Sequence, residues 1–293
     1  MLLHRYFNSH AFETLKDAKL KTARISSFND PFEFLYVHSV ERMTPDLARH
    51  FIRSFRSNPD FVLRLFGLSQ QLPIPPTEHE IQKRLDESEP LIIANLVKDW
   101  PDIANKAELP LARRRQIIDQ ELRAICFSDP SRVKRRDEIL LWSHYAKKHQ
   151  GIRIGFEFPG GMEERFEIVE MEYREDRVKV NCAFWAETEA LKGLEESARV
   201  KSKAWEYEWE YRLFIETNLC EPKTIENSHS LSTVEHFLEF KQDWVKTVDF
   251  GALCPDTEIQ RVVGLLKTDY LKNIIRKKAE FHKTEYALEY REL

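Results

Sequence analysis

The sequence predicts an α+β protein with a mostly antiparallel sheet, split or strongly twisted, that is flanked by helices and carries a helical insertion. Residues 152–158 alternate apolar and polar side chains, which is the period-two pattern of a half-buried strand. Residues 44–122 repeat apolar side chains three and four positions apart, as helices do. The sequence has no regular strand–helix alternation, which would indicate a parallel sheet. It also has no glycine-rich motif of the kind that binds nucleotides in doubly wound folds. We therefore expect one domain, residues 1–293, with an insertion at 44–122.

Turn and helix signals place the other elements. Asn29, Asp30 and Pro31 are strong turn residues, Asp137 can cap a helix that ends before Gly151, and residues 187–203 are rich in helix-forming side chains. We expect further helices at 11–18 and 270–279. We expect further strands at 2–7, 22–26, 123–128, 166–173, 205–217, 260–265 and 285–290.

Composition excludes several classes of protein. The 45 basic and 49 acidic residues give a net charge of −4, so we expect no specific nucleic-acid partner, and we expect the basic stretch at 113–136 to be solvent-exposed. No run of 18 apolar residues predicts a membrane span, and the first residues lack an apolar signal region. The four cysteines form no C-x-x-C pair and are expected to be buried free thiols, so we expect a cytoplasmic location.

Four segments share a recognisable order along the chain. They are LHRYF at 3–7, FNDPFE at 28–33, LWSHYA at 141–146 followed by Gln150–Ile152, and KAWEYEWEYR at 203–212. Together they resemble the bacterial domain-of-unknown-function family 2971 over residues 2 to about 290, and the last three segments are the specific ones. His4 departs from the family pattern, in which an aromatic residue is common at this position.

The order of the elements is also similar, more loosely, to that of ADP-ribosyltransferases. This resemblance implies a split antiparallel sheet that binds NAD as a substrate, and a late-strand glutamate that grips the nicotinamide ribose. His4 and Tyr6 alternate onto one strand face and are the implied contacts to the adenosine ribose and the nicotinamide ring. A partly buried pair on an edge strand is the structural alternative.

The segment at 203–212 holds the candidate catalytic residues. On a continuous strand Glu206, Glu208, Glu210 and Arg212 share one face. A fixed carboxylate beside an oxocarbenium-like transition state favours cleavage of a ribosyl bond, which is the role we expect for Glu210. We expect Glu208 to orient or deprotonate an acceptor, and Arg212 to hold Glu210 in place. The alternative is a solvated strand face with structural ion pairs.

The remaining candidates contact the ligand. Asn29 and Asp30 can present polar groups at the end of a strand, although a turn that bonds its own backbone explains them equally. Trp142 and Tyr145 are candidate ligand contacts on a helix, although successive positions differ by about 100° and some must be core. Residues 143–149 show neither a serine-hydrolase elbow nor a zinc-binding H-E-x-x-H pattern, so no metal cofactor is expected.

Three functions remain open from the sequence. The first is an enzyme of the ADP-ribosyltransferase type that takes a small nucleotide ligand, NAD, and an unknown acceptor. The second is a metal-dependent nuclease or phosphodiesterase, with Asp30, Glu208 and Glu210 on Mg²⁺ and the basic residues between 113 and 148 on the nucleic-acid backbone. The third is a non-catalytic sensor or interaction module in stress or phage defence, which predicts no pocket containing both Asn29 and Glu210.

Overall fold

The computed structural model describes residues 1–39, 42–54, 78–158, 166–181, 187–226, 232–267 and 271–293. The predicted α+β class with a mostly antiparallel sheet is confirmed. The chain divides into two compact units, of which the first comprises Met1–Leu35, Gln116–Arg177 and Ser197–Leu293, and the second Tyr36–Arg115 and Val178–Glu196. That residues 1–293 form a single domain with an insertion at 44–122 stays a prediction.

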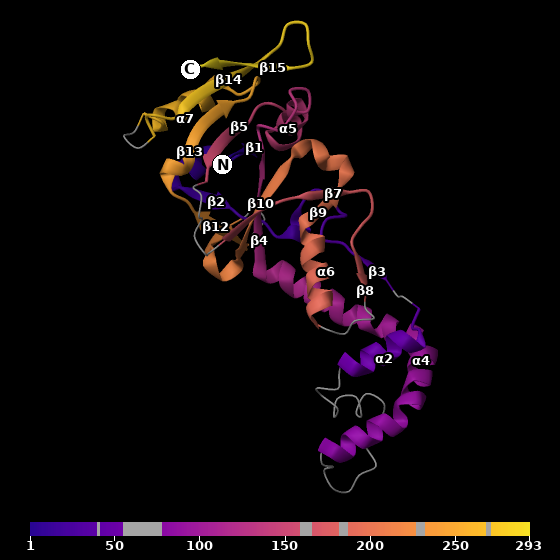
Figure 1. Ribbon diagram of the computed structural model, residues 1–293. Helices are drawn as coiled ribbons and strands as arrows, with labels where there is room; N and C mark the ends of the chain where they lie inside the picture. Colours follow the sequence, from indigo (N-terminus) through magenta and orange to yellow (C-terminus); the bar gives the residue numbers. More distant parts are fainter. Residues whose placement is uncertain (40–41, 55–77, 159–165, 182–186, 227–231, 268–270) are drawn as a thin grey trace. The chain divides into compact units, whose positions relative to one another are not determined.

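An eight-stranded sheet forms the centre of the first unit (Figure 1), in the order β15-β14-β13-β5-β1-β4-β10-β6. Its strands are β1 Leu2–Phe7, β4 Leu122–Ser128, β5 Ile152–Glu157, β6 Phe166–Glu170, β10 Glu210–Glu216, β13 Val245–Phe250, β14 Ile275–Phe281 and β15 Leu288–Glu292. Only the β13–β14 pair is parallel among these neighbours. β1 pairs with β5 along its whole length but with β4 at a single position, His4 opposite Ser128. The sheet therefore splits between β1 and β4.

The register of the sheet gathers polar side chains on one face. Residues directly opposite each other in an antiparallel pair point to the same face. Ser128 is opposite both His4 and Glu210, and Cys126 is opposite Arg212. The alternate residues of the same strands, such as Leu3, Ile125 and Leu213, join the main hydrophobic core. The split consequently lies beside a polar face that is backed by a packed apolar face.

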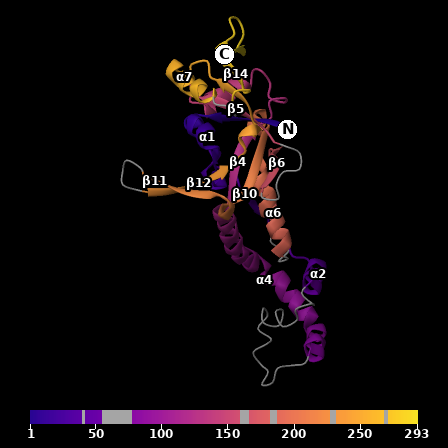
Figure 2. The same cartoon turned by 90° about the vertical axis from the view of Figure 1, so that its left-hand side faces the viewer.

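Smaller elements complete the first unit. They are α1 Ala11–Asp17, α5 Glu138–Tyr145, α7 Asp256–Leu265, the short 3₁₀ helices η1 Ile25–Ser27, η3 Lys203–Glu208, η4 Thr217–Leu219 and η5 Gln242–Trp244, and the strands β2 Lys19–Lys21, β7 Glu172–Arg174, β9 Val200–Ser202, β11 Glu221–Glu226 and β12 Ser232–Glu239. β11, β12 and β2 form a three-stranded sheet, and β7 pairs with β9. Figure 2 shows the β11–β12 hairpin from the side.

The second unit is mainly helical. It contains α2 Pro45–Ser54 and the parallel pair of β3 Val37–Ser39 and β8 Lys179–Asn181. Two helices, α4 Glu78–Glu121 and α6 Glu187–Arg199, contain boundaries between the two units. The basic residues Arg113, Arg114, Lys134, Arg135 and Arg136 are exposed, but the predicted exposure of the whole stretch 113–136 is wrong, because it includes the mostly buried strand β4, where Arg123 is 3% exposed.

Several predicted elements are wrong. Residues 260–265 belong to helix α7, in which Asp256 and Glu258 stabilise the first turn, and residues 275–279 belong to strand β14, which gains its hydrogen bonds from β13. The strand predicted at 22–26 lies earlier, at β2, and α6 ends at Arg199 before β9. At β14, pairing with a distant strand overrides the local helix propensity.

Two further expectations concern cysteines and membrane spans. Cys126, Cys220 and Cys254 are free thiols, and Cys182 lies outside the described residues. Cys220 and Cys254 are buried, whereas Cys126 is partly exposed. Among the described residues, no helix has both the length and the apolar character needed to cross a membrane.

Gly151 closes an unusual turn after α5. Lys147, Lys148 and His149 all have positive φ angles, of 48°, 54° and 67°, and Gly151 N then donates a hydrogen bond of 2.8 Å to Ala146 O. A Cβ atom at Gly151 would lie 2.1 Å from Phe7 O, which belongs to the backbone of β1. The glycine therefore allows the chain to enter β5 in contact with β1.

We expect Gly151→Ala to lower the free energy of unfolding by about 1–3 kcal/mol or more, because backbone atoms have to move. Gly264→Ala is the matched control, since a Cβ atom there meets nothing within 4 Å and alanine favours a helix by about 1 kcal/mol. Urea unfolding of both variants measures the difference. Equal stability of the two would contradict this account of the turn.

Candidate functional site

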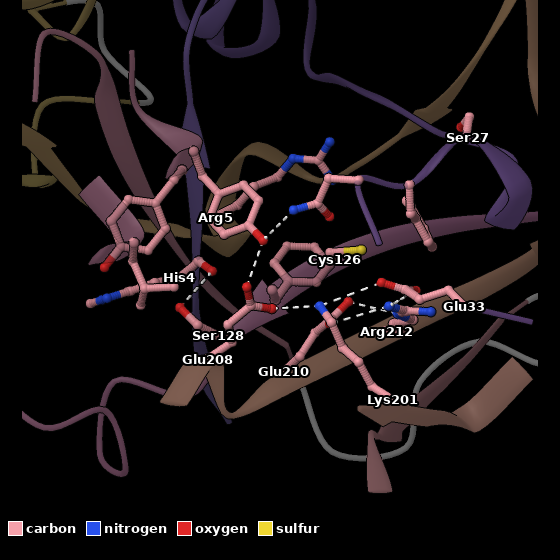
Figure 3. A pocket seen from close by; sticks show the side chains of 16 residues that line it. His4, Arg5, Ser27, Glu33, Cys126, Ser128, Lys201, Glu208, Glu210 and Arg212 are labelled. Carbon is pink, nitrogen blue, oxygen red and sulfur yellow. Dashed lines mark hydrogen bonds and ion pairs between the residues drawn. The ribbon is translucent and has the colours of Figure 1, made fainter. Parts of the chain in front are cut away.

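A cavity of about 280 Å³ lies where β1 and β4 diverge (Figure 3). Its walls come from β1, the turn after η1, β4, α5, β9, η3 and β10. Seven of the nine predicted site residues line it: His4, Tyr6, Asn29, Tyr145, Glu208, Glu210 and Arg212. The predicted convergence of Tyr6, Asn29, Tyr145 and Glu210 on one cleft is confirmed, while the roles of these residues stay predictions.

The two candidate glutamates reach the cavity by a different path from the predicted one. Residues 203–208 form the 3₁₀ helix η3, and β10 begins only at Glu210. Between them Trp209 has a φ of 44°, an uncommon value for a bulky residue. The predicted continuous strand with four alternating carboxylate and arginine positions is therefore wrong. The turn at Trp209 nevertheless leaves Glu208 and Glu210 buried side by side, with 4% and 3% exposure.

Lys201 connects these carboxylates. Its Nζ atom donates hydrogen bonds of 2.6 Å to Glu208 Oε2 and 2.7 Å to Glu210 Oε2. The side chain comes from the short strand β9 and is itself buried. The ammonium group therefore occupies the space between two carboxylates that would otherwise repel each other.

Arg212 supplies the second buried cation. Its Nε atom donates to Glu210 Oε1 at 2.6 Å, and its Nη2 atom donates to Glu210 Oε2 at 3.2 Å and also to Glu33 Oε2. The guanidinium carbon lies 4.5 Å from the centre of the Phe28 ring. The predicted role of Arg212 in orienting Glu210 thus has a direct geometric basis (Figure 3).

A chain of hydrogen bonds leads from Glu208 to the FNDPFE turn. Tyr145 OH donates to Glu208 Oε1 at 2.5 Å and accepts a hydrogen bond of 3.1 Å from Asn29 Nδ2. Asn29 is exposed, whereas Glu208 is buried. These hydrogen bonds therefore connect the buried carboxyl group of Glu208 with the exposed side chain of Asn29.

Burial and charge set the protonation of the site. Burial alone raises the pKa of a carboxyl group, but Arg212 and Lys201 outweigh it and lower the pKa of Glu210 to about 2. For Glu208 burial prevails over Lys201, and its pKa is raised. Burial opposes the charge of Lys201, but the neighbouring carboxylates raise its pKa above the ordinary value. Glu210 and Lys201 are therefore charged at neutral pH.

Arg5 was not predicted, and it also lines the cavity, although it alternates onto the opposite face of β1 from His4 and Tyr6 and lies near the core rings of Phe7 and Phe127. Its Nη2 atom donates to Lys21 O at 3.1 Å, whereas its Nη1 atom is buried without a hydrogen-bond partner among the described residues. Burial lowers the pKa of this guanidinium to about 10, so it remains charged at neutral pH. A buried charged donor without a partner is costly and suits a ligand that accepts its hydrogen bond.

His4 is neutral in this site. Burial, together with the charges of Arg153 and Lys277, lowers its pKa to about 2. The backbone carbonyl of His4 accepts a hydrogen bond of 3.4 Å from Ser128 Oγ, at the one position where β1 and β4 pair. A neutral imidazole can donate or accept a hydrogen bond but adds no charge to the cavity.

Trp142 and Asp30 are corrections, because neither is among the residues that line this cavity. Trp142 is fully buried, its Nε1 atom donates to Tyr290 OH at 3.0 Å, and its ring meets that of Tyr6 edge-on at 5.2 Å. Asp30 Oδ1 accepts a hydrogen bond of 2.9 Å from Phe32 N, which is the structural alternative for this turn. Trp142 supports Tyr6 from behind, and Asp30 shapes the turn that carries Asn29.

The network behind Tyr6 is held by a buried arginine. Arg153 donates hydrogen bonds of 3.0 and 2.8 Å to Asp249 Oδ2, and one of 3.3 Å to Tyr6 OH. It also contacts Glu138 of α5, which accepts a hydrogen bond of 2.7 Å from Tyr290 OH. The hydroxyl of Tyr6 is thereby fixed, and its ring is left to line the cavity.

Residues 141–213 match a family model described as Protein of unknown function (DUF2971). This match confirms the predicted family resemblance over residues 141–213, whereas the resemblance over the rest of residues 2–290, with the LHRYF and FNDPFE segments, stays a prediction. The matched segment contains the LWSHYA and KAWEYEWEYR motifs. It supplies Tyr145, Lys201, Glu208, Glu210 and Arg212 to the cavity, whereas His4, Arg5, Asn29 and Glu33 come from outside the match. No curated protein and no solved structure shows significant similarity to this chain.

Proposed function

We propose that the cavity binds NAD and that the protein is an enzyme of the ADP-ribosyltransferase type with an acceptor still to be identified. The observation that carries this proposal is that one cavity contains both a surplus of carboxylates and a guanidinium with an unused hydrogen-bond donor. The buried network holds three carboxylates, Glu33, Glu208 and Glu210, against two cations, Lys201 and Arg212. Arg5 supplies a separate guanidinium with an unused donor. NAD carries complementary groups, a cationic nicotinamide ring and an anionic diphosphate.

The size of the cavity suits one end of NAD. Pockets for drug-sized ligands range from about 300 to 1,000 Å³. A cavity of about 280 Å³ is just below that range, which suits the nicotinamide and its ribose rather than the whole of NAD. In this proposal the carboxylate network faces the nicotinamide ribose, and Arg5 faces the diphosphate as the molecule leaves the cavity.

The two glutamates divide the chemistry. Glu210 is held ionised by Arg212 and Lys201, and in this proposal it stabilises the positive charge that develops on the ribosyl carbon as the bond to nicotinamide breaks. The bonding electrons leave with nicotinamide, which departs neutral. Glu208 then accepts the proton that the acceptor loses when its oxygen or nitrogen bonds to the same carbon. Tyr145 orients Glu208 for this step.

The two other functions have less support in the geometry. Lys201 Nζ already lies 2.6 and 2.7 Å from Glu208 and Glu210, where a shared Mg²⁺ would have to bind, and Asp30 is not among the lining residues. Among the described residues, no group of three or more His, Cys, Asp or Glu side chains is placed to hold a metal ion. An interaction module does not require a pocket with both Asn29 and Glu210, and this cavity contains both.

Calorimetric titration with NAD and with nicotinamide riboside tests the proposal. Nicotinamide riboside keeps the cationic ring and the ribose but lacks the diphosphate. We expect Arg5→Met to weaken NAD binding by about 10- to 100-fold, because a hydrogen bond to a charged group contributes roughly 1.5–3 kcal/mol. Binding of nicotinamide riboside should not change. Equal weakening of both ligands, or of neither, would contradict the assignment of Arg5 to the diphosphate.

A further inference from the structure

Glu33 is the member of the carboxylate network with an unused oxygen. Its side chain is 1% exposed and lines the cavity. Oε2 accepts a hydrogen bond from Arg212, whereas Oε1 is buried without a hydrogen-bond partner among the described residues. Lys201 Nζ lies 3.5 Å from Oε1, and it is already bonded to Glu208 and Glu210.

The charges of the network do not balance. Glu33, Glu208 and Glu210 together carry one negative charge more than Lys201 and Arg212 can neutralise if all five groups are ionised. A surplus charge in a buried cluster is costly and is usually removed by a proton or a ligand. Burial raises the pKa of Glu33, although Arg212 and Lys201 act in the opposite direction.

Among the described residues, the other titratable groups beside the network do not offset this charge. Arg5 on β1 is charged and lines the same cavity, but its guanidinium lies near the Phe7 and Phe127 rings and donates to Lys21 O. Tyr207 of η3 is neutral at neutral pH, because burial raises its pKa to about 12. Burial raises the pKa values of Cys126 on β4, Tyr145 on α5 and Tyr173 on β7, so all three are neutral at neutral pH. His4 on β1 is also neutral there, because burial lowers its pKa to about 2. Lys201 and Arg212 are already ionised, so neither can supply a further positive charge.

We propose that Glu33 holds one proton in the ligand-free protein and releases it when a cationic ring enters the cavity, so that Glu33 selects a cationic ligand over its neutral counterpart. The identity of the ring as a pyridinium rests on the proposed function. The exchange balances, since one proton leaves Glu33 Oε1 for solvent as one positive charge binds. Glu208 and Glu210 are less suited to this role because each of their carboxylates has Lys201 as a hydrogen-bond donor and a second donor besides.

Selection by Glu33 also provides a route for product release. When the bond to ribose breaks, the ring becomes neutral, and the proton that the acceptor loses passes to Glu208, which then releases it to solvent. Glu33 is then again a surplus carboxylate and takes up a proton. The neutral ring consequently binds more weakly than the cationic ring of the substrate.

Carbon-13 NMR of protein labelled at the glutamate side-chain carboxyl tests the proton without any ligand. The resonance that Glu33→Gln removes should have the chemical shift of a protonated carboxyl at neutral pH. Glu208→Gln should move the same resonance to the position of a carboxylate, because two carboxylates then face two cations. Glu157→Gln, at an exposed glutamate of β5, should leave it unchanged. A Glu33 resonance already at the carboxylate position in the wild type would overturn the proposal.

Calorimetry with 1-methylnicotinamide, a cation, and nicotinamide, its neutral counterpart, tests the selection. The wild type should bind the cation about 10- to 100-fold more tightly and release one proton as it binds. Glu33→Gln should lose both the preference and the proton release. An unchanged preference in Glu33→Gln would overturn selection by Glu33 while NAD binding stands. If the wild type binds neither probe nor NAD, the proposed function fails, and the proton on Glu33 is decided by the NMR result.

Discussion

Glu210→Gln is expected to lower the rate of nicotinamide release by about 10²- to 10³-fold, or roughly 3–4 kcal/mol of transition-state stabilisation. The substitution keeps the shape of the side chain and deletes its charge. In the folded protein Glu210 is ionised, because Arg212 and Lys201 hold its pKa at about 2. The lost charge is therefore one that the wild type carries at any assay pH well above 2.

The control for this prediction is Glu216→Gln, at the exposed far end of the same strand. It should leave the rate unchanged. Thermal unfolding of both variants separates catalysis from stability. Glu210→Gln leaves two carboxylates facing two cations, so the buried network remains balanced and the variant should fold. Turnover by Glu210→Gln equal to that of the wild type would show that the role of Glu210 is misassigned. An inactive Glu208→Gln together with an active Glu210→Gln would show that the two roles have been exchanged.

Arg212→Met is expected to lower the free energy of unfolding by about 3–5 kcal/mol, which is typical when one partner of a buried ion pair is removed. Arg212 is 1% exposed and donates hydrogen bonds to both Glu210 and Glu33. Its loss leaves three buried carboxyl groups with a single ammonium group. Arg212→Lys should recover only part of the stability, since an ammonium group cannot reproduce the forked contacts of the guanidinium.

Urea unfolding measures this effect, with Arg291→Met as the matched control. Arg291 pairs with Glu280 at 3.0 Å on the surface of β15, where both side chains are more than half exposed. Surface pairs of this kind contribute about 0–1 kcal/mol. If Arg212→Met and Arg291→Met lower the free energy of unfolding by similar amounts, the ion pairs of Arg212 do not behave as buried ones, which would contradict this account.

Local patterns in the sequence predict part of this site correctly. Alternation along β10 places Glu210 and Arg212 on one face, and the two side chains are indeed hydrogen-bonded. Glu208 reaches the cavity for another reason, because a left-handed residue at Trp209 redirects the chain after η3. A period-two pattern cannot predict such a turn, so the predicted continuous strand was wrong. Glu208, the site residue predicted from it, nevertheless lines the cavity.

The missed residues depend on long-range contacts. Lys201 lies on a three-residue strand that pairs with β7, and Glu33 and Arg212 are 179 positions apart in the sequence. The network between the two segments arises only when the sheet forms. The FNDPFE motif contains Glu33 and could have indicated it. The functional interpretation of this motif was instead assigned to the turn residues Asn29 and Asp30.

The tail shows the same limit for the fold. Residues 275–281 contain four charged side chains among seven, which hides their β-strand, and β13 supplies the parallel partner that stabilises it. The apolar residues of helix α7 fit either a helix or a strand when only a few positions are considered. By contrast, β1 and β5, which lie side by side near the centre of the sheet, were predicted within about one residue.

The most direct test of the central claim is to incubate the wild-type protein with NAD and to follow nicotinamide by chromatography. Water can capture the ribosyl group when no other acceptor is present, so the account predicts that nicotinamide and ADP-ribose appear in equal amounts. It also predicts that both products are reduced about 10²- to 10³-fold with Glu210→Gln. NAD that binds to the wild type but stays intact, or that is broken down equally by both proteins, would contradict the assignment of this cavity as an NAD-cleaving site.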